Sequence, residues 1–345
     1  MSLPKLPSLS TVIRDSRFAL GIARRRPFQV LLQVSNRCNM KCSFCDFWPN
    51  VAPRKDELTV ADYLRIADEL AELGCFLVSV EGGEPTLRAD LDQIIAAFAR
   101  KHVPVLFTNG WHITKERAEQ LFAAGVTQVG VSIDFADAAR HDHKRGLQGA
   151  SERAWRAIDL LKAAAPHGGK QVHVMSVLMR ENQDEIEALF ARSAAHGVGH
   201  QFTLLSQSGF RRSQRTADDQ LPDVGMGEKL LSLWQRFPHV RYLRDYAAQI
   251  DPFLSGAQLP QCSAGRQSFN IDHIGDVALC IEKINRPLGN VKRESMATIY
   301  ARLASDTQSA TCQDCFTACR GFAQALSSGG SPRAWRDLAT RMRSY

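Results

Sequence analysis

Between residues 28 and 205, short apolar runs alternate with amphipathic segments, and this alternation constrains the fold more than any other feature of the chain. Six runs are strand-like: 28–34, 75–80, 103–107, 127–133, 170–178 and 200–205. The segments between them have the apolar spacing of helices, and several end in glycine, which commonly stops a helix. Six consecutive β–α units predict an α/β fold with a parallel sheet, either open or curled into a barrel.

The regularity ends near residue 206. Residues 206–225 are polar and turn-rich, which predicts a linker or lid, and a helix is expected at about 226–237. Downstream, "SFNIDHIGDVALC" has the pattern of a hairpin with its turn near residues 273–276, and "MATIYARLAS" is predicted to be a helix. These patterns predict an N-terminal helical extension, a barrel, a linker with a helix, a small α+β domain and a helical, basic tail. Their bounds are 1–27, 28–210, 211–249, 250–322 and 323–345.

The composition describes a globular chain with a sizeable core. Of 345 residues, 44% are hydrophobic and 23% are charged, and this length accommodates one large domain and a smaller one. No stretch approaches the ~18 consecutive apolar residues of a membrane span. The first residues lack the apolar block of a secretory signal. A cytoplasmic location is therefore expected.

Basic residues exceed acidic ones by 43 − 36 = 7, which gives a pI near 9.0. Part of this excess is Arg24, Arg25 and Arg26, which follow an amphipathic segment. We interpret that segment as a short helix that caps the main domain, and weak contact with an anionic membrane surface is the alternative. No basic stripe with interleaved aromatic residues points to nucleic acid. The apolar face of the predicted helix comprises Leu9, Val12, Ile13, Leu20 and Ala23.

Eight of the nine cysteines fall in two groups, which indicates metal binding. Cys38, Cys42 and Cys45 form a Cys-x3-Cys-x2-Cys pattern, and five more cysteines occur after residue 261. Cys75 stands alone in an apolar run and is expected to be a buried thiol. Because no secretion signal is recognised, clustered cysteines favour metal over disulfides.

Three early thiolates without a fourth ligand allow two interpretations. Thiolates suit iron–sulfur clusters, and a missing protein ligand would leave one iron open for a cofactor or substrate. A zinc site completed by Asp46 or His112 is the alternative. Zinc ligands, however, usually occur as two close pairs, so the iron–sulfur interpretation is favoured.

Polar residues follow the first four predicted strands, where the loops of a β/α fold gather at one rim. The first loop carries the three cysteines, and the second is "EGGEPT" at 81–86. The third is "TNG" at 108–110, and the fourth strand ends in "SID" at 132–134. Because the carboxyl ends of neighbouring parallel strands meet at the same rim, we expect one functional site there.

These motifs together resemble the radical S-adenosylmethionine (SAM) superfamily, in which Cys-x3-Cys-x2-Cys follows the first strand, an aromatic residue precedes the third cysteine and Gly-Gly-Glu-Pro follows the second strand. The resemblance covers about residues 28–205 and includes "HDHKRG" at 141–146. It implies a partial (β/α)6 barrel in which three thiolates bind three irons of a [4Fe–4S] cluster. The amino and carboxylate groups of SAM would chelate the fourth iron.

The resemblance also implies which residues contact SAM. Phe44 would pack on the adenine, and Glu84 would accept a hydrogen bond from the ammonium group. Glycines 82 and 83 would let the backbone approach the methionine end of the cofactor. Phe135 replaces the family's usual glycine after Ser-x-Asp, so the detailed geometry of that loop is not implied. The predicted contacts are Phe44, Gly82, Gly83, Glu84, Thr108, Asn109, Ser132 and Asp134.

The late cysteines resemble the SPASM and twitch extensions of the same superfamily, which carry auxiliary [4Fe–4S] clusters. The first two flank Gly275 with the opening spacing of these extensions, and "CQDCFTAC" adds a Cys-x2-Cys-x3-Cys pattern. A full SPASM module has seven cysteines and two clusters, whereas this region has five, so one auxiliary cluster is predicted. A zinc site is the alternative. The candidate ligands are Cys262, Cys280, Cys312, Cys315 and Cys319, with Cys312 and Cys315 preferred among the last three.

The resemblance implies an enzyme with a small cluster-binding domain after its barrel. An outside donor such as flavodoxin or ferredoxin would reduce the barrel cluster, and SAM would be cleaved to a 5′-deoxyadenosyl radical that takes hydrogen from a substrate C–H bond. The auxiliary cluster would accept an electron from the substrate radical or, alternatively, bind or orient the substrate. Net oxidation or rearrangement of a small molecule or natural product is therefore the predicted reaction, with the substrate itself unspecified.

Two other functions are weighed. A peptide-modifying enzyme, resembling the maturases of ribosomally made peptides or of sulfatases, is less expected, because the first strand begins by residue 28 and leaves no room for the peptide-recognition domain often fused ahead of such members. A non-enzymatic iron–sulfur electron carrier or sensor is disfavoured by the Gly-Gly-Glu-Pro loop, since a carrier needs no cofactor-binding rim.

Overall fold

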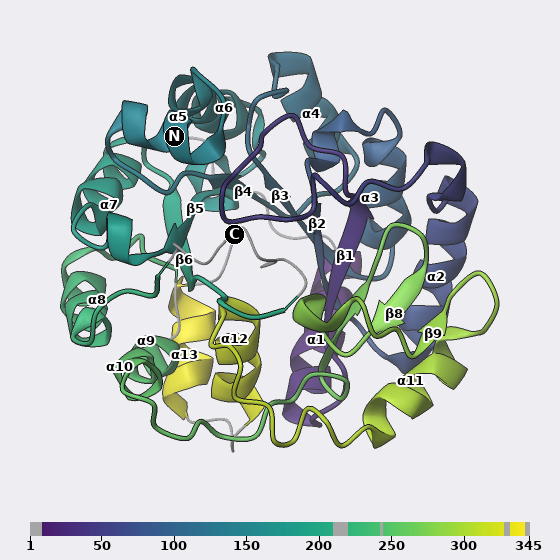
Figure 1. Ribbon diagram of the computed structural model, residues 1–345. Helices are drawn as coiled ribbons and strands as arrows, with labels where there is room; N and C mark the ends of the chain where they lie inside the picture. The colour runs from purple at the N-terminus through teal and green to yellow at the C-terminus, as the bar shows by residue number, and fades with distance from the viewer. Residues whose placement is uncertain (1–8, 210–219, 242–243, 328–331, 342–345) are drawn as a thin grey trace.

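The computed structural model describes residues 9–209, 220–241, 244–327 and 332–341. Its centre is a nine-stranded sheet with the strand order β6-β5-β4-β3-β2-β1-β7-β8-β9 (Figure 1). All neighbours among the first six strands are parallel, as the β–α alternation predicts. These strands are β1 (Gln29–Ser35), β2 (Leu77–Gly82), β3 (Val103–Thr108), β4 (Gln128–Ser132), β5 (Val172–Leu178) and β6 (Gly199–Leu204). The prediction of a partial barrel is confirmed.

Helices cover the outer face of the curled sheet (Figure 1). The cause is the period-two pattern of the strands: Val30, Leu32 and Val34 of β1 pack against the helices in the main core, whereas Leu31 packs on the opposite face. The surrounding helices are α2 (Val60–Leu73), α3 (Leu91–Ala99), α4 (Lys115–Ala123), α5 (Ala138–Arg145), α6 (Ala150–Ala164) and α7 (Ile186–Ala195). Short 3₁₀ helices occur at Arg54–Asp56, Pro85–Leu87, Gly168–Gln171, Arg180–Asn182 and Ile281–Lys283.

Helix α2 shows how local sequence defines these elements. Thr59 and Asp62 form a reciprocal capping box at its start, and Gly74 follows its end. Tyr63, Ile66 and Leu70 lie on one face at helical spacing and are buried against the sheet.

The region after the barrel continues the same sheet. Strand β7 (Ser268–Ile271) pairs in parallel with β1, with Leu31 opposite Asn270. Strands β8 (Asp276–Ala278) and β9 (Gly289–Asn290) then add antiparallel pairs, which confirms the predicted hairpin. The remaining helices are α8 (Met226–Arg236), α9 (Arg244–Ala248), α10 (Ile250–Leu254), α11 (Met296–Ser305), α12 (Ala318–Ser327) and α13 (Pro332–Arg341).

Two of the predicted domain boundaries fall within helices of the structure. Position 250 is the first residue of α10, and position 322 lies inside α12, which contacts both β6 and the N-terminal helix. The predicted linker or lid falls largely on residues 210–219, which lie outside the described residues.

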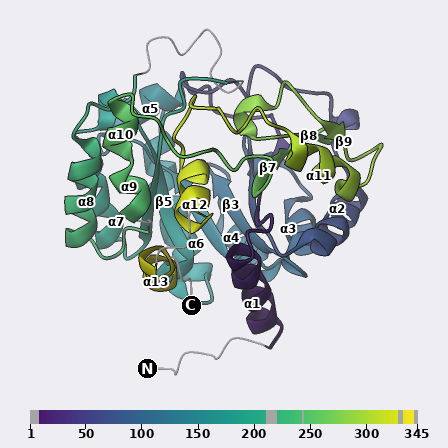
Figure 2. The same ribbon diagram turned by 90° about the horizontal axis from the view of Figure 1, so that it is seen from below.

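The N-terminal helix α1 (Leu9–Ala23) packs beside α12 (Figure 2). Its packing face differs from the predicted one, because Leu9 (76% exposed), Ile13 and Leu20 are exposed to solvent. Phe18 and Ile22 instead pack against a small separate core that includes residues of α12 and α13. The helix therefore docks through Phe18 and Ile22, and the predicted apolar face is turned largely to solvent.

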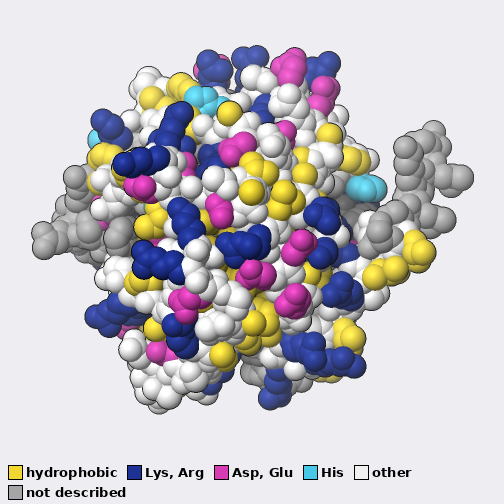
Figure 3. Space-filling model, turned by 90° about the vertical axis from the view of Figure 1, so that its right-hand side faces the viewer, with side chains coloured by type: hydrophobic (Ala, Val, Ile, Leu, Met, Phe, Trp, Pro, Cys, Tyr) yellow, Lys and Arg dark blue, Asp and Glu magenta, His cyan; other side chains and the backbone are white. Residues whose placement is uncertain are grey.

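None of the described helices combines the length and apolar character needed to cross a bilayer. On the face drawn in Figure 3, basic side chains are interspersed with acidic ones and with apolar groups. The positive net charge is therefore distributed over this face without a continuous basic surface.

Candidate active site

The three early cysteines lie on the loop that leaves β1 at the barrel rim. Cys42 is buried, whereas Cys38 and Cys45 are half-buried. The surrounding shell is apolar and brings together distant parts of the chain; its buried members are Met40, Phe44, Phe135, Ala150, Met179 and Leu205. A dry shell of this kind shields a cluster and its cofactor from water.

The chemistry of this donor set fits a thiolate-ligated cluster. Burial, partly opposed by a hydrogen bond from the Met40 amide, and then the nearby charges of Glu84, Cys42 and Cys45 raise the pKa of the Cys38 thiol to about 12. The pKa of Cys42 is raised to about 11, chiefly by burial. The Met40 amide lies 3.4 Å from the Cys38 Sγ atom. The charges of neighbouring cysteines thus contribute to the raised pKa of Cys38 and of Cys42 in this low-dielectric pocket. Binding of iron would replace the thiol protons.

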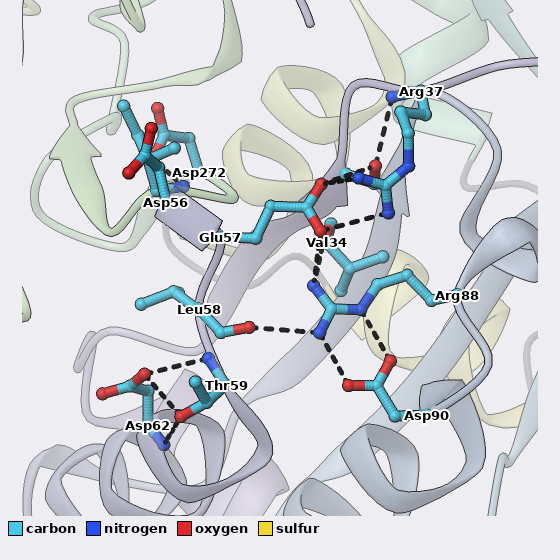
Figure 4. Close-up of polar contacts among 12 residues, drawn as sticks. Val34, Arg37, Asp56, Glu57, Leu58, Thr59, Asp62, Arg88, Asp90 and Asp272 are labelled. Atoms are coloured by element: carbon cyan, nitrogen blue, oxygen red, sulfur yellow. Dashed lines mark hydrogen bonds and ion pairs between the residues drawn. The ribbon is translucent and has the colours of Figure 1, made fainter. Parts of the chain in front are cut away.

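A buried ion network fixes the start of this loop (Figure 4). Glu57 pairs with Arg37, directly before Cys38, at 2.7 Å and with Arg88 at 3.4 Å. Arg88 also donates to the Val34 carbonyl oxygen at 3.0 Å and pairs with Asp90 at 2.8 Å. Both ends of the segment between β1 and α2 are therefore tied to the sheet. Sequence patterns did not identify Glu57 or Arg88, because their partners are distant in the chain.

Gly82 and Gly83 pack against the cysteine loop. A Cβ atom on Gly83 would lie 2.2 Å from the Arg37 carbonyl oxygen, and one on Gly82 would lie 2.2 Å from that of Ser35. The Gly83 amide donates to the Ser35 carbonyl at 2.6 Å, and the Glu84 amide donates to the Arg37 carbonyl at 2.7 Å. The glycines thus permit close approach between two protein loops, in addition to the predicted approach to SAM.

Glu84 joins the second and third rim loops. It is 1% exposed, and its carboxylate accepts hydrogen bonds from the Thr86 amide (3.0 Å), the Thr108 hydroxyl (2.7 Å) and the Asn109 amide (2.7 Å). The Thr86 hydroxyl donates a fourth at 2.5 Å. Three of these donors meet Oε1 and the Asn109 amide meets Oε2, so the carboxylate is held from both neighbouring loops.

The remaining predicted contacts gather at the same rim. Asn109 donates to Asn39 at 2.8 Å and lies 4.0 Å from the Cys38 Sγ atom. Ser132 is half-buried at the end of β4, and Phe44 is buried beside the cysteines. Asp134 is fully buried and pairs with Arg145 at 2.6 Å, so in this structure its carboxylate is directed to the protein.

A second site lies beside the inner face of β1. One cavity is lined by all five late cysteines together with Leu31 and Ser268 of the sheet. Burial is the main cause of the raised pKa of Cys280, Cys312 and Cys315. A sulfur-rich, otherwise mostly apolar cavity fits an iron–sulfur cluster.

The five thiols are not equivalent. The charges of Cys319, Cys280 and Cys262 contribute to the raised pKa of Cys315. The charges of Cys319 and Cys262 contribute in the same way to the raised pKa of Cys280. The charge of Cys262 contributes to the raised pKa of Cys312. Within the described part of the chain, no three His, Cys, Asp or Glu side chains are grouped as for a single metal ion.

Arg320 organises the loops around this cavity. Its guanidinium donates to the carbonyl oxygens of Cys312 (3.1 Å), Cys315 (3.0 Å) and Pro260 (2.9 Å). The side chain is buried and lies on α12, so this helix connects the cavity to the barrel. Sequence analysis missed Arg320, although its position next to Cys319 is a signal that could have been noticed.

A small apolar group separates the two sites. Leu31, Phe47, Ile281 and Ile284 pack together, and both Cys45 and Cys319 pack against them. One cysteine of each group therefore touches the same set of side chains. The two cysteine sites are neighbours across a dry contact.

A partial parallel barrel with three thiols at its rim and a cysteine-lined cavity beside its first strand defines an iron–sulfur enzyme of the radical SAM class. Comparison with protein families agrees: residues 32–192 match the radical SAM superfamily, and residues 262–316 match the SPASM iron–sulfur cluster-binding domain. The chain belongs to the radical SAM superfamily and carries a C-terminal SPASM domain. Its cofactors are the SAM-binding [4Fe–4S] cluster, SAM and auxiliary iron–sulfur.

Known proteins resemble the chain over most of its length. It is 30% identical over 324 residues to the mycofactocin maturase MftC of Mycolicibacterium smegmatis, covering 87% of this chain and 78% of that protein. An AdoMet-dependent heme synthase of Nitratidesulfovibrio vulgaris is 27% identical over 294 residues, covering 78% and 77%. A PqqA peptide cyclase of Granulibacter bethesdensis is 29% identical over 173 residues, covering 50% and 45%. The fold resembles that of Streptococcus suis SuiB bound to its precursor peptide, with a TM-score of 0.62 at 17% identity over 92% of this chain and 77% of that one.

Proposed function

We propose that this enzyme modifies a peptide by radical chemistry. The observation that carries the proposal is the similarity to MftC, a maturase, over 87% of the chain. A second relative is a peptide cyclase by name, and SuiB, which shares the fold, was solved with a precursor peptide. The sequence analysis favoured a small-molecule substrate because the first strand begins by residue 28. The similarity to MftC favours a peptide instead.

The interior of the barrel supports a substrate with amide groups. Gln33 on β1 and Asn270 on β7 lie on the same inward face as Leu31, and both are fully buried. Both side chains end in an amide. Among the described residues, neither the amide NH₂ group nor the amide oxygen of Gln33 or Asn270 has a hydrogen-bond partner. A peptide group offers one donor and one acceptor, which is the complement that these amides need.

The residues of the rim would bind and orient the cofactors. When bound, the reduced cluster and SAM supply a 5′-deoxyadenosyl radical that removes hydrogen from a C–H bond. Cys38, Cys42 and Cys45 would hold the cluster, and the apolar shell around Phe44 would exclude water. We propose that Glu84 serves this site mainly by positioning the second and third loops, because its carboxylate already accepts four hydrogen bonds from residues of those loops.

For the auxiliary cluster we propose Cys262, Cys280, Cys315 and Cys319 as ligands. Support comes from the cavity that these four residues line and from the charges of Cys262, Cys280 and Cys319, which contribute to the raised pKa of Cys315. This differs from the preference for Cys312 and Cys315, which rested on spacing alone. We propose that electrons pass between the clusters across the apolar group against which Cys45 and Cys319 both pack, and flavodoxin or ferredoxin remains the predicted outside donor.

The test is substrate-dependent cleavage of SAM by anaerobically reconstituted enzyme with dithionite. One arm uses synthetic peptides from short reading frames beside the gene, and the other uses heme precursors, prompted by the heme synthase relative. A peptide of altered mass formed together with 5′-deoxyadenosine would support the proposal. Turnover of a heme precursor with no peptide altered would overturn the peptide assignment and leave the radical SAM class intact.

A further inference from the structure

We propose that Arg145 raises the reduction potential of the barrel cluster through its contact with Cys42. The residue belongs to "HDHKRG" at 141–146, a motif that the proposed function does not otherwise use. Its Nη1 atom donates to the Cys42 Sγ atom at 3.9 Å, and its guanidinium carbon lies 5.3 Å from the centre of the Phe44 ring. A full positive charge thus lies against one predicted cluster ligand.

Helix α5 holds this charge in place through the backbone. The Lys41 amide donates to the Arg145 carbonyl at 3.1 Å, and the Ser43 amide donates to the Lys144 carbonyl at 3.3 Å. Gly146 ends the helix at φ 64°, and a Cβ atom there would lie 2.8 Å from the Lys41 carbonyl oxygen. The residues on both sides of Cys42 are therefore bonded to the last turn of α5, which defines the distance between guanidinium and thiol.

The guanidinium is buried but remains charged. Arg145 is 8% exposed and pairs with Asp134 at 2.6 Å. An arginine side chain stays protonated in proteins, and the neighbouring Asp134 carboxylate stabilises its charge at this buried position. Asp134 is itself held by the Val177 amide at 2.9 Å. The cluster thus faces an oriented ion pair whose cationic member contacts its ligand.

The sign of the effect follows from charge. Reduction adds one electron, and hence one negative charge, to the thiolate-bound cluster. A nearby cation stabilises the reduced form more than the oxidised form, and little water is present to screen the interaction. Loss of the Arg145 charge should therefore lower the potential, whereas loss of the Asp134 charge should raise it. A purely structural ion pair would not produce opposite shifts, because either change breaks the same contact.

The experiment is a redox titration of the reconstituted full-length enzyme, followed by electron paramagnetic resonance. The barrel cluster is recognised as the signal that changes when SAM is added. At a fixed solution potential, Arg145→Met should lower the ratio of reduced to oxidised cluster about tenfold, which is about 59 mV for one electron. Asp134→Asn should shift this ratio upward. Arg145→Lys keeps the charge and should remain closer to the wild type than Arg145→Met.

Lys144→Met is the matched control, since it removes the same charge from the same helix, where Lys144 pairs with Glu181 at 2.8 Å. It should shift the potential less than Arg145→Met. An unchanged potential in Arg145→Met, or shifts of the same sign in Arg145→Met and Asp134→Asn, would overturn the proposal. If Arg145→Met does not bind iron, Asp134→Asn decides: an upward shift of its potential supports the proposal, and an unchanged potential overturns it.

Discussion

Gly83 illustrates how a single residue can hold two rim loops together. Because a Cβ atom there would lie 2.2 Å from the Arg37 carbonyl oxygen, Gly83→Ala should displace the loop that carries Cys38. We expect the variant to lose most of its barrel iron, measured by iron content and visible absorbance. Gly21→Ala is the control, since nothing lies within 4 Å of that position, and it should be neutral or stabilise α1 by about 0.5–1 kcal/mol. Full iron loading in Gly83→Ala would contradict this role.

Glu84→Gln distinguishes a bracing residue from a direct SAM ligand. The amide presents an NH₂ group to donors that now meet a carboxylate oxygen, and an unmatched buried donor costs about 1–3 kcal/mol. If Glu84 braces the loops, thermal stability and SAM affinity should fall together. Calorimetry and thermal unfolding measure the two effects. A fall in affinity alone, about tenfold, would instead favour the direct contact with the ammonium group that the family resemblance implies.

At the scale of elements, the late cysteines test how the cavity is built. Cys319 packs against the apolar group that also contacts Cys45, and its charge contributes to the raised pKa of both Cys280 and Cys315. We expect Cys319→Ala to lose the auxiliary cluster and Cys312→Ala to retain it. Iron and sulfide content, with Mössbauer spectra, would show the difference. The reverse result would restore Cys312 and Cys315 as the ligand pair.

The hairpin turn between β7 and β8 should give the stability of the fold a pH dependence. Burial raises the pKa of Asp272 from 3.8 to about 6, so the folded state binds a proton more tightly than the unfolded state. The stabilisation is therefore present at low pH and is lost as the pH rises from about 4 to about 6. Asp272→Asn should remove this loss, because its side-chain oxygen can still accept from the Ile274 and Asp276 amides. Unfolding free energies of both proteins between pH 4 and 7 should diverge; parallel curves would contradict the assignment.

At the scale of the whole molecule, the two cysteine sites share one sheet. Since β7 pairs with β1, the auxiliary region and the barrel should unfold together. Cys280→Ala should therefore lower the temperature of a single transition, as cluster ligation contributes to folding. Calorimetry of wild type and variant checks this. Two separate transitions would show that the region after residue 250 is an independent domain.

The sequence by itself determined the β–α alternation, the parallel strands and the class of chemistry, because these depend on local periodicity and on closely spaced ligands. The three early cysteines, the Gly-Gly-Glu-Pro loop and the late cysteines are all short-range patterns. Strand positions agree with the structure to within about two residues for the same reason.

Only the tertiary structure decided how these parts meet. Glu57, Arg88 and Arg320 act through partners far away in the chain, and the role of Arg145 depends on the approach of α5 to the cysteine loop. The docking face of α1 likewise depends on the side chains of α12 and α13 that meet Phe18 and Ile22. Periodicity indicates which residues can face a core. It does not indicate which charges pair, which residues line a cavity or how five cysteines group, because these depend on contacts between residues that are distant in the chain.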